Sequence, residues 1–223
     1  MALDNSYLKE IQKQLGYFGA WSPDTTYAIG DYGNMDGKQF EKLGNIKKWI
    51  EPKTRGEGGT EQIYYTSAGD VNVKSTIGAK DTTGMVQVDL EISFAKENSI
   101  FFLAQNVTTV STANIGAVGD KIVDVYKRSG NDWKLSYVWI AEIKQAAYLK
   151  VIISQSSDAR IKLSGKAPVV VSGVPVANID FSALMTKSKN AVSEFQGTNK
   201  TPLLRFYEVK DPITKKAFYT EYK

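Results

Sequence analysis

The clearest pattern in the chain is a strict alternation of apolar and polar residues over positions 86–94. Successive side chains of a β-strand point to opposite faces, so this alternation predicts a strand with one apolar and one polar face. A shorter alternation over 71–77 precedes it, separated by a turn at 78–84, and we expect the two segments to pair. The predicted apolar face of the longer strand consists of Val86, Val88, Leu90, Ile92 and Phe94.

A second pattern, apolar residues three or four positions apart, predicts two helices. The first is an amphipathic helix near the start of the chain, marked by Leu8, Ile11, Leu15 and Phe18. Asp4, Asn5 or Ser6 is expected to cap this helix, because each has a short side-chain oxygen for an unpaired first-turn amide. A second, short helix is expected over 118–128, just before Gly130.

Aromatic and β-branched residues predict further strands in the rest of the chain. These cover residues 100–104, 133–143, 148–154, 159–163, 179–185, 203–209 and 217–222. Glycines in 30–37 predict tight turns between strands, and 51–59 predicts an exposed mobile loop. The expected fold is therefore a single α+β domain over 1–223, a twisted and mostly antiparallel sheet with an N-terminal amphipathic helix and a few short helices.

The composition restricts the chemistry that this fold could perform. The 223 residues include no histidine and no cysteine, so Ser-His-Asp and Cys-His arrangements and ordinary zinc sites cannot be built. Asp89 and Glu91 would stand ~6.6 Å apart on one strand face, within the range of an inverting glycosidase pair. Any solvated strand face produces such pairs, so we expect no enzyme, metal site or cofactor, but a binding or assembling protein.

The charge of the chain is mildly basic, with a net charge of +4 and a pI near 9.0. This balance favours solubility, and it also suits attraction to an anionic surface, either nucleic acid or acidic lipid. The sequence has no RNP-like motif, zinc-finger spacing or basic helix, so no nucleic-acid partner is expected. The first residues lack the basic start and apolar run of a secretory signal, which predicts a cytoplasmic protein.

The order of the predicted elements along the chain is informative. An amphipathic opening helix is followed by an apolar patch ending at Leu43-Gly44-Asn45-Ile46, then by paired amphipathic strands and a short helix. The strand Tyr137–Ile143 and a closing strand over Thr201–Val209 with an aromatic tail complete the order. This order resembles the pore-forming domain of bacterial gasdermins. The resemblance spans most of the chain and rests on element order and strand pattern.

The resemblance implies a membrane-permeabilising protein of bacterial defence or cell death. Gasdermins are held inactive, are released by a protease, and then oligomerise on acidic membranes while two hairpin regions become transmembrane strands. The corresponding regions here would be Val71–Ala104 and Trp133–Ser164. They would add Val151, Ile153, Ile161 and Leu163 to the apolar face, and the expected contacts with acidic lipid are Lys9, Lys13, Arg160 and Lys162.

The alternation itself fits this role, since ~9 to 11 residues allow a tilted strand to cross a bilayer. The sequence differs from the family in having no cysteine to lipidate, and only residues 218–223 could act as the inhibitory segment. The alternative is a non-enzymatic adaptor or structural subunit that binds a protein partner. It would use sheet edges and the exposed aromatics Trp21, Tyr32 and Trp49.

Overall fold

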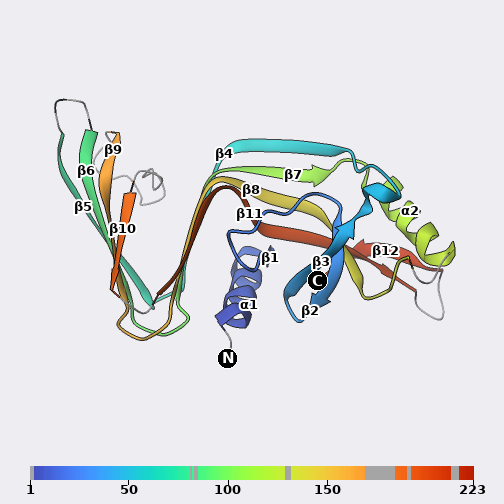
Figure 1. Cartoon of the computed structure of the whole chain (residues 1–223), viewed down its shortest axis with the longest axis horizontal. Helices are drawn as coiled ribbons and strands as arrows, with labels where there is room; N and C mark the ends of the chain where they lie inside the picture. Colours follow the sequence, from blue (N-terminus) through green and yellow to red (C-terminus); the bar gives the residue numbers. More distant parts are fainter. Residues whose placement is uncertain are drawn as a thin grey trace. The chain divides into compact units, whose positions relative to one another are not determined.

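The computed structural model describes residues 3–80, 82, 85–128, 132–168, 184–189, 192–211 and 216–223. Most of these residues form antiparallel sheet, and one helix opens the chain, which confirms the predicted α+β class (Figure 1). No helix in these ranges combines the length and the apolar character needed to cross a membrane.

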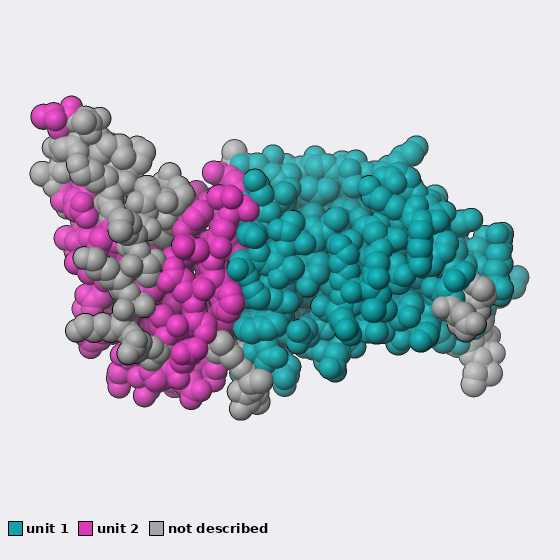
Figure 2. Space-filling view, viewed as in Figure 1, with its two compact units in different colours: residues 1–60, 107–146, 199–223 teal, residues 61–106, 147–198 magenta. Residues whose placement is uncertain are grey.

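The chain folds into two compact units (Figure 2). Unit 1 consists of Met1–Thr60, Val107–Ala146 and Asn199–Lys223, and unit 2 of Glu61–Asn106 and Ala147–Thr198. Each boundary in sequence falls inside a strand, namely β4 (Thr54–Thr66), β7 (Ile100–Thr112), β8 (Tyr137–Ser154) and β11 (Val192–Lys210). The single domain expected from the sequence stays a prediction.

Unit 1 contains the short strands of the larger sheet (Figure 1). They are β1 (Phe18–Gly19), β2 (Asp31–Asp36), β3 (Gln39–Asn45) and β12 (Phe218–Glu221). The sheet order is β1-β11-β8-β2-β3, with β12 also paired to β11, β4 paired to β7, and β7 paired to β8. A 3-10 helix, η1 (Ile46–Lys48), follows β3.

The opening helix α1 (Leu3–Leu15) follows its apolar pattern. Tyr7, Leu8 and Ile11 are almost fully buried, and Gly16 ends the helix with a φ of 70°. Phe18 was expected within the helix, but it lies in β1 because the chain turns at Gly16.

The predicted capping residues of α1 lie elsewhere in the helix. Asp4, Asn5 and Ser6 already belong to its first turns, so the predicted cap is wrong. Asp4 still suits its position, because a carboxylate in the first turn interacts favourably with the helix dipole.

The second helix, α2 (Ile115–Arg128), is confirmed and begins three residues earlier than predicted. Val118, Ile122 and Val125 are buried on its inner side. Gly119 lies against β12, where a Cβ built on this glycine would overlap the ring of Tyr219. The missing side chain therefore lets the strand β12 pack close to the helix.

Replacing Gly119 with alanine should lower the free energy of unfolding by about 1–3 kcal/mol, because the Tyr219 ring must move. Urea unfolding followed by circular dichroism measures this loss. In a Tyr219→Ala background the same Gly119→Ala change should instead stabilise by about 0.5–1 kcal/mol, since alanine favours the helix. Equal losses in both backgrounds would show that the ring does not set the cost.

Three other sequence predictions differ from the structure. The expected mobile loop 51–59 mostly belongs to the strand β4, in which Gly58 and Gly59 have positive φ values of 92° and 128°. The glycine-rich segment 30–37 is mainly the strand β2, with the predicted turns confined to its two ends, at Gly30 and Gly37. The two strands expected over 133–143 and 148–154 form one continuous strand, β8.

The strand β8 continues because its polar middle lies at the surface of unit 1 with partners of its own. Glu142 accepts a hydrogen bond from the hydroxyl of Tyr17 at 2.5 Å and pairs with Arg205 at 3.5 Å. The ammonium group of Lys144 lies 5.6 Å from the centre of the Tyr17 ring. Polar residues within β8 are thus satisfied without ending the strand.

Unit 2 contains a second, four-stranded sheet, with the order β10-β9-β6-β5 and antiparallel neighbours. Its strands are β5 (Val71–Lys80), β6 (Met85–Phe94), β9 (Arg160–Pro168) and β10 (Leu184–Lys189). Of the strand expected over 179–185, residues 179–183 lie outside the described residues.

Candidate functional site

The candidate site is the sheet β10-β9-β6-β5, which carries the pattern that dominates the sequence. Its register places Val71 opposite Phe94 and Leu90 opposite Leu163. Directly opposed residues of an antiparallel pair share a face, so the alternations of β5, β6 and β9 add up to one apolar and one polar surface.

The apolar surface is buried within unit 2. Six predicted members each have an exposed fraction of 1% or less, namely Val88, Leu90, Ile92, Phe94, Ile161 and Leu163. Val71 and Val73 of β5 pack against them. The side chain of Val86, also predicted for this face, lies outside the described residues. The predicted apolar face is thus the inner face of a packed core.

Residues of β7 and β8 cover this apolar surface. Phe101 and Leu103 of β7 and Ile152 of β8 belong to the same buried cluster. Val151 and Ile153, which the sequence analysis assigned to this surface, are buried but flank Ile152 along the strand. Because neighbouring residues alternate, they point to the opposite side of β8 from Ile152, and their place in a membrane-facing surface stays a prediction.

The polar surface of the sheet carries ion pairs between β6 and β9. Lys162 lies 3.3 Å from Asp89, and Arg160 lies 4.0 Å from Glu91. Gln87 donates a hydrogen bond to Asp89 at 3.3 Å. The two carboxylates proposed as a glycosidase pair therefore serve as partners for cations of the neighbouring strand, as on any solvated strand face.

The four predicted contacts with acidic lipid form two groups. Arg160 and Lys162 lie together on β9 with side chains 70% and 54% exposed, although each has the acidic partner described above. Lys9 and Lys13 are exposed in α1 and, four residues apart, share one side of the helix. The first pair belongs to unit 2 and the second to unit 1.

A cavity of about 260 Å³ opens beside the same sheet, at the turn before β5. Its charged and polar lining includes Asp70, Asn72, Ser93, Asp158 and Arg160. Asp70 also pairs with Lys96 at 2.8 Å, so the lining mixes both signs of charge. In the ranges that the structure describes, no three acidic side chains gather as ligands for a metal ion.

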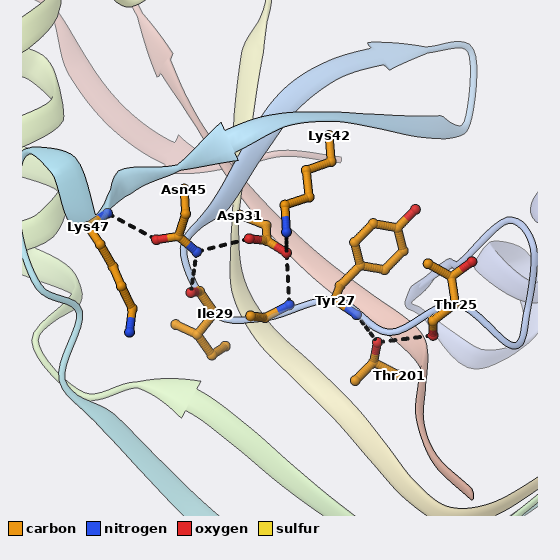
Figure 3. A network of polar contacts seen from close by, with 9 residues as sticks. Thr25, Tyr27, Ile29, Asp31, Lys42, Asn45, Lys47 and Thr201 are labelled. Carbon is orange, nitrogen blue, oxygen red and sulfur yellow. Dashed lines mark hydrogen bonds and ion pairs between the residues drawn. The ribbon is translucent and has the colours of Figure 1, made fainter. Parts of the chain in front are cut away.

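A buried polar network in unit 1 holds the segment that leads into β2 (Figure 3). The Asp31 carboxylate, 1% exposed, accepts hydrogen bonds from the Ala28 amide and the Asn45 side chain, each at 2.9 Å, and pairs with Lys42 at 2.9 Å. Burial, and next the Asp31 charge, raise the pKa of Tyr27. The Ala28 bond fixes backbone, and the Asn45 and Lys42 contacts join the side chains of β3 to that of Asp31, which makes the network structural.

The aromatic residues of the adaptor alternative are less exposed than expected. Tyr32 is buried with 7% exposed, so its predicted exposure is wrong. Its hydroxyl lies 2.8 Å from the Lys48 ammonium, which in turn lies 3.9 Å from the centre of the Trp49 ring. Trp21 and Trp49 are only partly exposed.

A charged group inside unit 2 is not among the residues predicted from the sequence. Lys150 of β8 is 1% exposed and forms an ion pair with Glu194 of β11. A signal for it exists, because this lysine is the one charged residue within the apolar run over 146–153. A lone charge in such a run indicates either a break in the strand or a buried partner.

Comparison with known proteins adds no assignment to this geometry. No protein-family model matches the chain, and no curated protein sequence matches it.

Proposed function

We propose that the chain is a membrane-permeabilising protein, similar to the pore-forming domain of bacterial gasdermins, that oligomerises on acidic membranes after activation by a protease. The observation that carries this proposal is the two-faced sheet β10-β9-β6-β5. Its apolar and polar residues are segregated over 88–94 of β6 and 160–163 of β9.

The dimensions of the sheet support a role in a bilayer. Strands β5 and β6 have ten residues each and β9 has nine, close to the ~9 to 11 residues that a tilted membrane strand requires. The apolar surface contains Leu90, Ile92 and Leu163 without an interposed charge. Lipid could therefore replace the cover from β7 and β8 with little change in the surroundings of these side chains.

The polar surface suits the water-filled side of a membrane sheet. Asp89 and Glu91 already have cationic partners on β9, so the charges of the two strands balance one another locally. A lumen-facing surface of a membrane barrel is polar in this way, whereas charges on its lipid-facing side are costly. The same strands therefore have one face suited to lipid and the other suited to water.

The test is dye release from vesicles of defined composition. Vesicles that contain phosphatidylserine should bind the chain and release dye, at least after limited proteolysis, and vesicles of phosphatidylcholine alone should not. The proposal is wrong if neither the intact nor the nicked chain binds acidic vesicles or releases dye from them.

A charge variant tests the predicted lipid contacts on α1. Each lysine near an anionic surface contributes about 1 kcal/mol to binding, so Lys9→Gln with Lys13→Gln should weaken vesicle binding by about 30-fold. The control variant, Lys47→Gln with Glu51→Gln, removes an exposed ion pair 3.0 Å long without changing net charge, and should bind as the unchanged chain does. Equal binding by all three would exclude α1 from the contact surface.

A further inference from the structure

Lys150 places a positive charge inside the core of unit 2. Its side chain is 1% exposed, and its neighbours on the same face of β8 are Tyr148 and Ile152. Both neighbours pack in the cluster that covers the apolar surface of β6 and β9. The ammonium group is therefore held beside apolar residues and away from water.

Two partners of Lys150 come from the beginning of β11. Its ammonium group pairs with the Glu194 carboxylate and donates a hydrogen bond to the Gln196 side-chain oxygen at 3.0 Å. Val192, two residues before Glu194, packs against the same apolar cluster. The contact between β8 and this part of β11 is thus partly ionic, where the rest of the core is apolar.

A buried ion pair holds two strands together differently from an apolar contact. When the strands separate, both charges recover their hydration, which offsets much of the lost attraction. Apolar side chains gain no comparable hydration when they are exposed to water, and they lose the favourable free energy of their burial. Separation is therefore easier where Lys150 meets Glu194 than it would be with apolar residues in their place.

The beginning of β11 is also less enclosed than its continuation. Residues 192–198 are half-buried or exposed, whereas Thr201, Leu203 and Leu204 are buried. The strands β1 and β12 pair with the later part of β11, at Leu203–Leu204 and Tyr207–Lys210. The early part thus lacks the burial that fixes the rest of the strand.

We propose that the Lys150–Glu194 ion pair makes residues 192–198 a releasable strand, whose separation from β8 opens the core behind the sheet β10-β9-β6-β5. The opening involves residues of unit 2 alone. Its use in exposing the apolar surface to lipid rests on the proposed function.

Hydrogen exchange of the full chain tests the release. In the apolar variant, Lys150→Met with Glu194→Met, the amides of 192–198 should exchange at least tenfold more slowly, while those of β6 change less than twofold. In Glu194→Gln, which removes the carboxylate charge that pairs with the ammonium, the same amides should exchange at least tenfold faster. The control, Lys162→Gln with Asp89→Asn, removes an exposed pair and should leave 192–198 unchanged.

Unchanged or faster exchange of 192–198 in the folded apolar variant overturns the proposal. If that variant does not fold, the Glu194→Gln variant provides the test. Unchanged exchange of 192–198 in Glu194→Gln also overturns the proposal. Dye release separates the two proposals, because the apolar variant should release dye more slowly than the unchanged chain. If no form releases dye but the exchange rates follow the expected order, the membrane function fails and the releasable strand stands.

Discussion

Replacing Leu90 with alanine should lower the free energy of unfolding by about 2–5 kcal/mol, because the change leaves a cavity in a closely packed core. Leu90 is fully buried, lies opposite Leu163, and belongs to the apolar cluster of unit 2. The measurement is urea unfolding followed by far-ultraviolet circular dichroism. Since all four tryptophans (Trp21, Trp49, Trp133 and Trp139) lie in unit 1, their fluorescence reports whether that unit unfolds in the same transition.

The next residue along β6 provides the matched control for Leu90. Glu91 points to the polar surface with a side chain 51% exposed, and its ion pair with Arg160 is 4.0 Å long. Glu91→Ala should cost less than about 1 kcal/mol, as expected for an exposed pair. If Glu91→Ala cost as much as Leu90→Ala, the segregation of the two surfaces would be refuted, and the proposed membrane sheet with it.

Replacing Trp139 with alanine should cost about 3–5 kcal/mol, the usual range for a buried large aromatic. Trp139 is fully buried in the core of unit 1, where its ring centre lies 5.9 Å from that of Trp133 and 5.7 Å from that of Tyr207. Loss of this ring leaves α2, β8 and β11 around a large cavity. Tryptophan fluorescence in urea, from the three remaining indoles, follows the transition.

A phenylalanine at the same position separates packing from hydrogen bonding. The indole N–H of Trp139 has no acceptor among the described residues, so Trp139→Phe removes no hydrogen bond within them. We expect it to retain more than half of the stability that Trp139→Ala loses. Equal losses in the two variants would mean that the N–H group, and not the ring, carries the energy.

The prediction of the sheet succeeded where one face of a strand is apolar and the other polar. The alternation over 86–94 is compatible with a single register, because a shift by one residue would bury Asp89 and Glu91 and expose Leu90. The strand β6 accordingly runs over Met85–Phe94. The helix α2 was found for the same reason, since its buried residues Val118, Ile122 and Val125 follow helical spacing.

Prediction failed where a strand tolerates residues that usually end one. The three glycines of β4 indicate a loop. Two of them, Gly58 and Gly59, have positive φ angles, yet β4 continues through them and pairs with β7. In β8, the polar residues Glu142 and Lys144 indicate a break, and distant partners such as Tyr17 and Arg205 cannot be inferred from local pattern.

The candidate site was foreseen only in part for a related reason. The faces of β6 and β9 follow from their own alternation, but β7 over 100–104 and β8 over 151–153 are apolar on both sides, so periodicity could not assign their faces. Because of that ambiguity, the predicted apolar surface included Val151 and Ile153, whereas Ile152 is the residue that belongs to the apolar cluster. The partner of Lys150 could not be read from the sequence at all.

The interleaving of the two units along the chain has a consequence for synthesis on the ribosome. The apolar surface of β6 is covered in part by Ile152, and unit 1 requires Asn199–Lys223. At ~5–20 residues per second, several seconds pass between the synthesis of β6 and that of Ile152. The nascent chain thus presents to any chaperone at the ribosome the same apolar strand that the finished protein keeps buried.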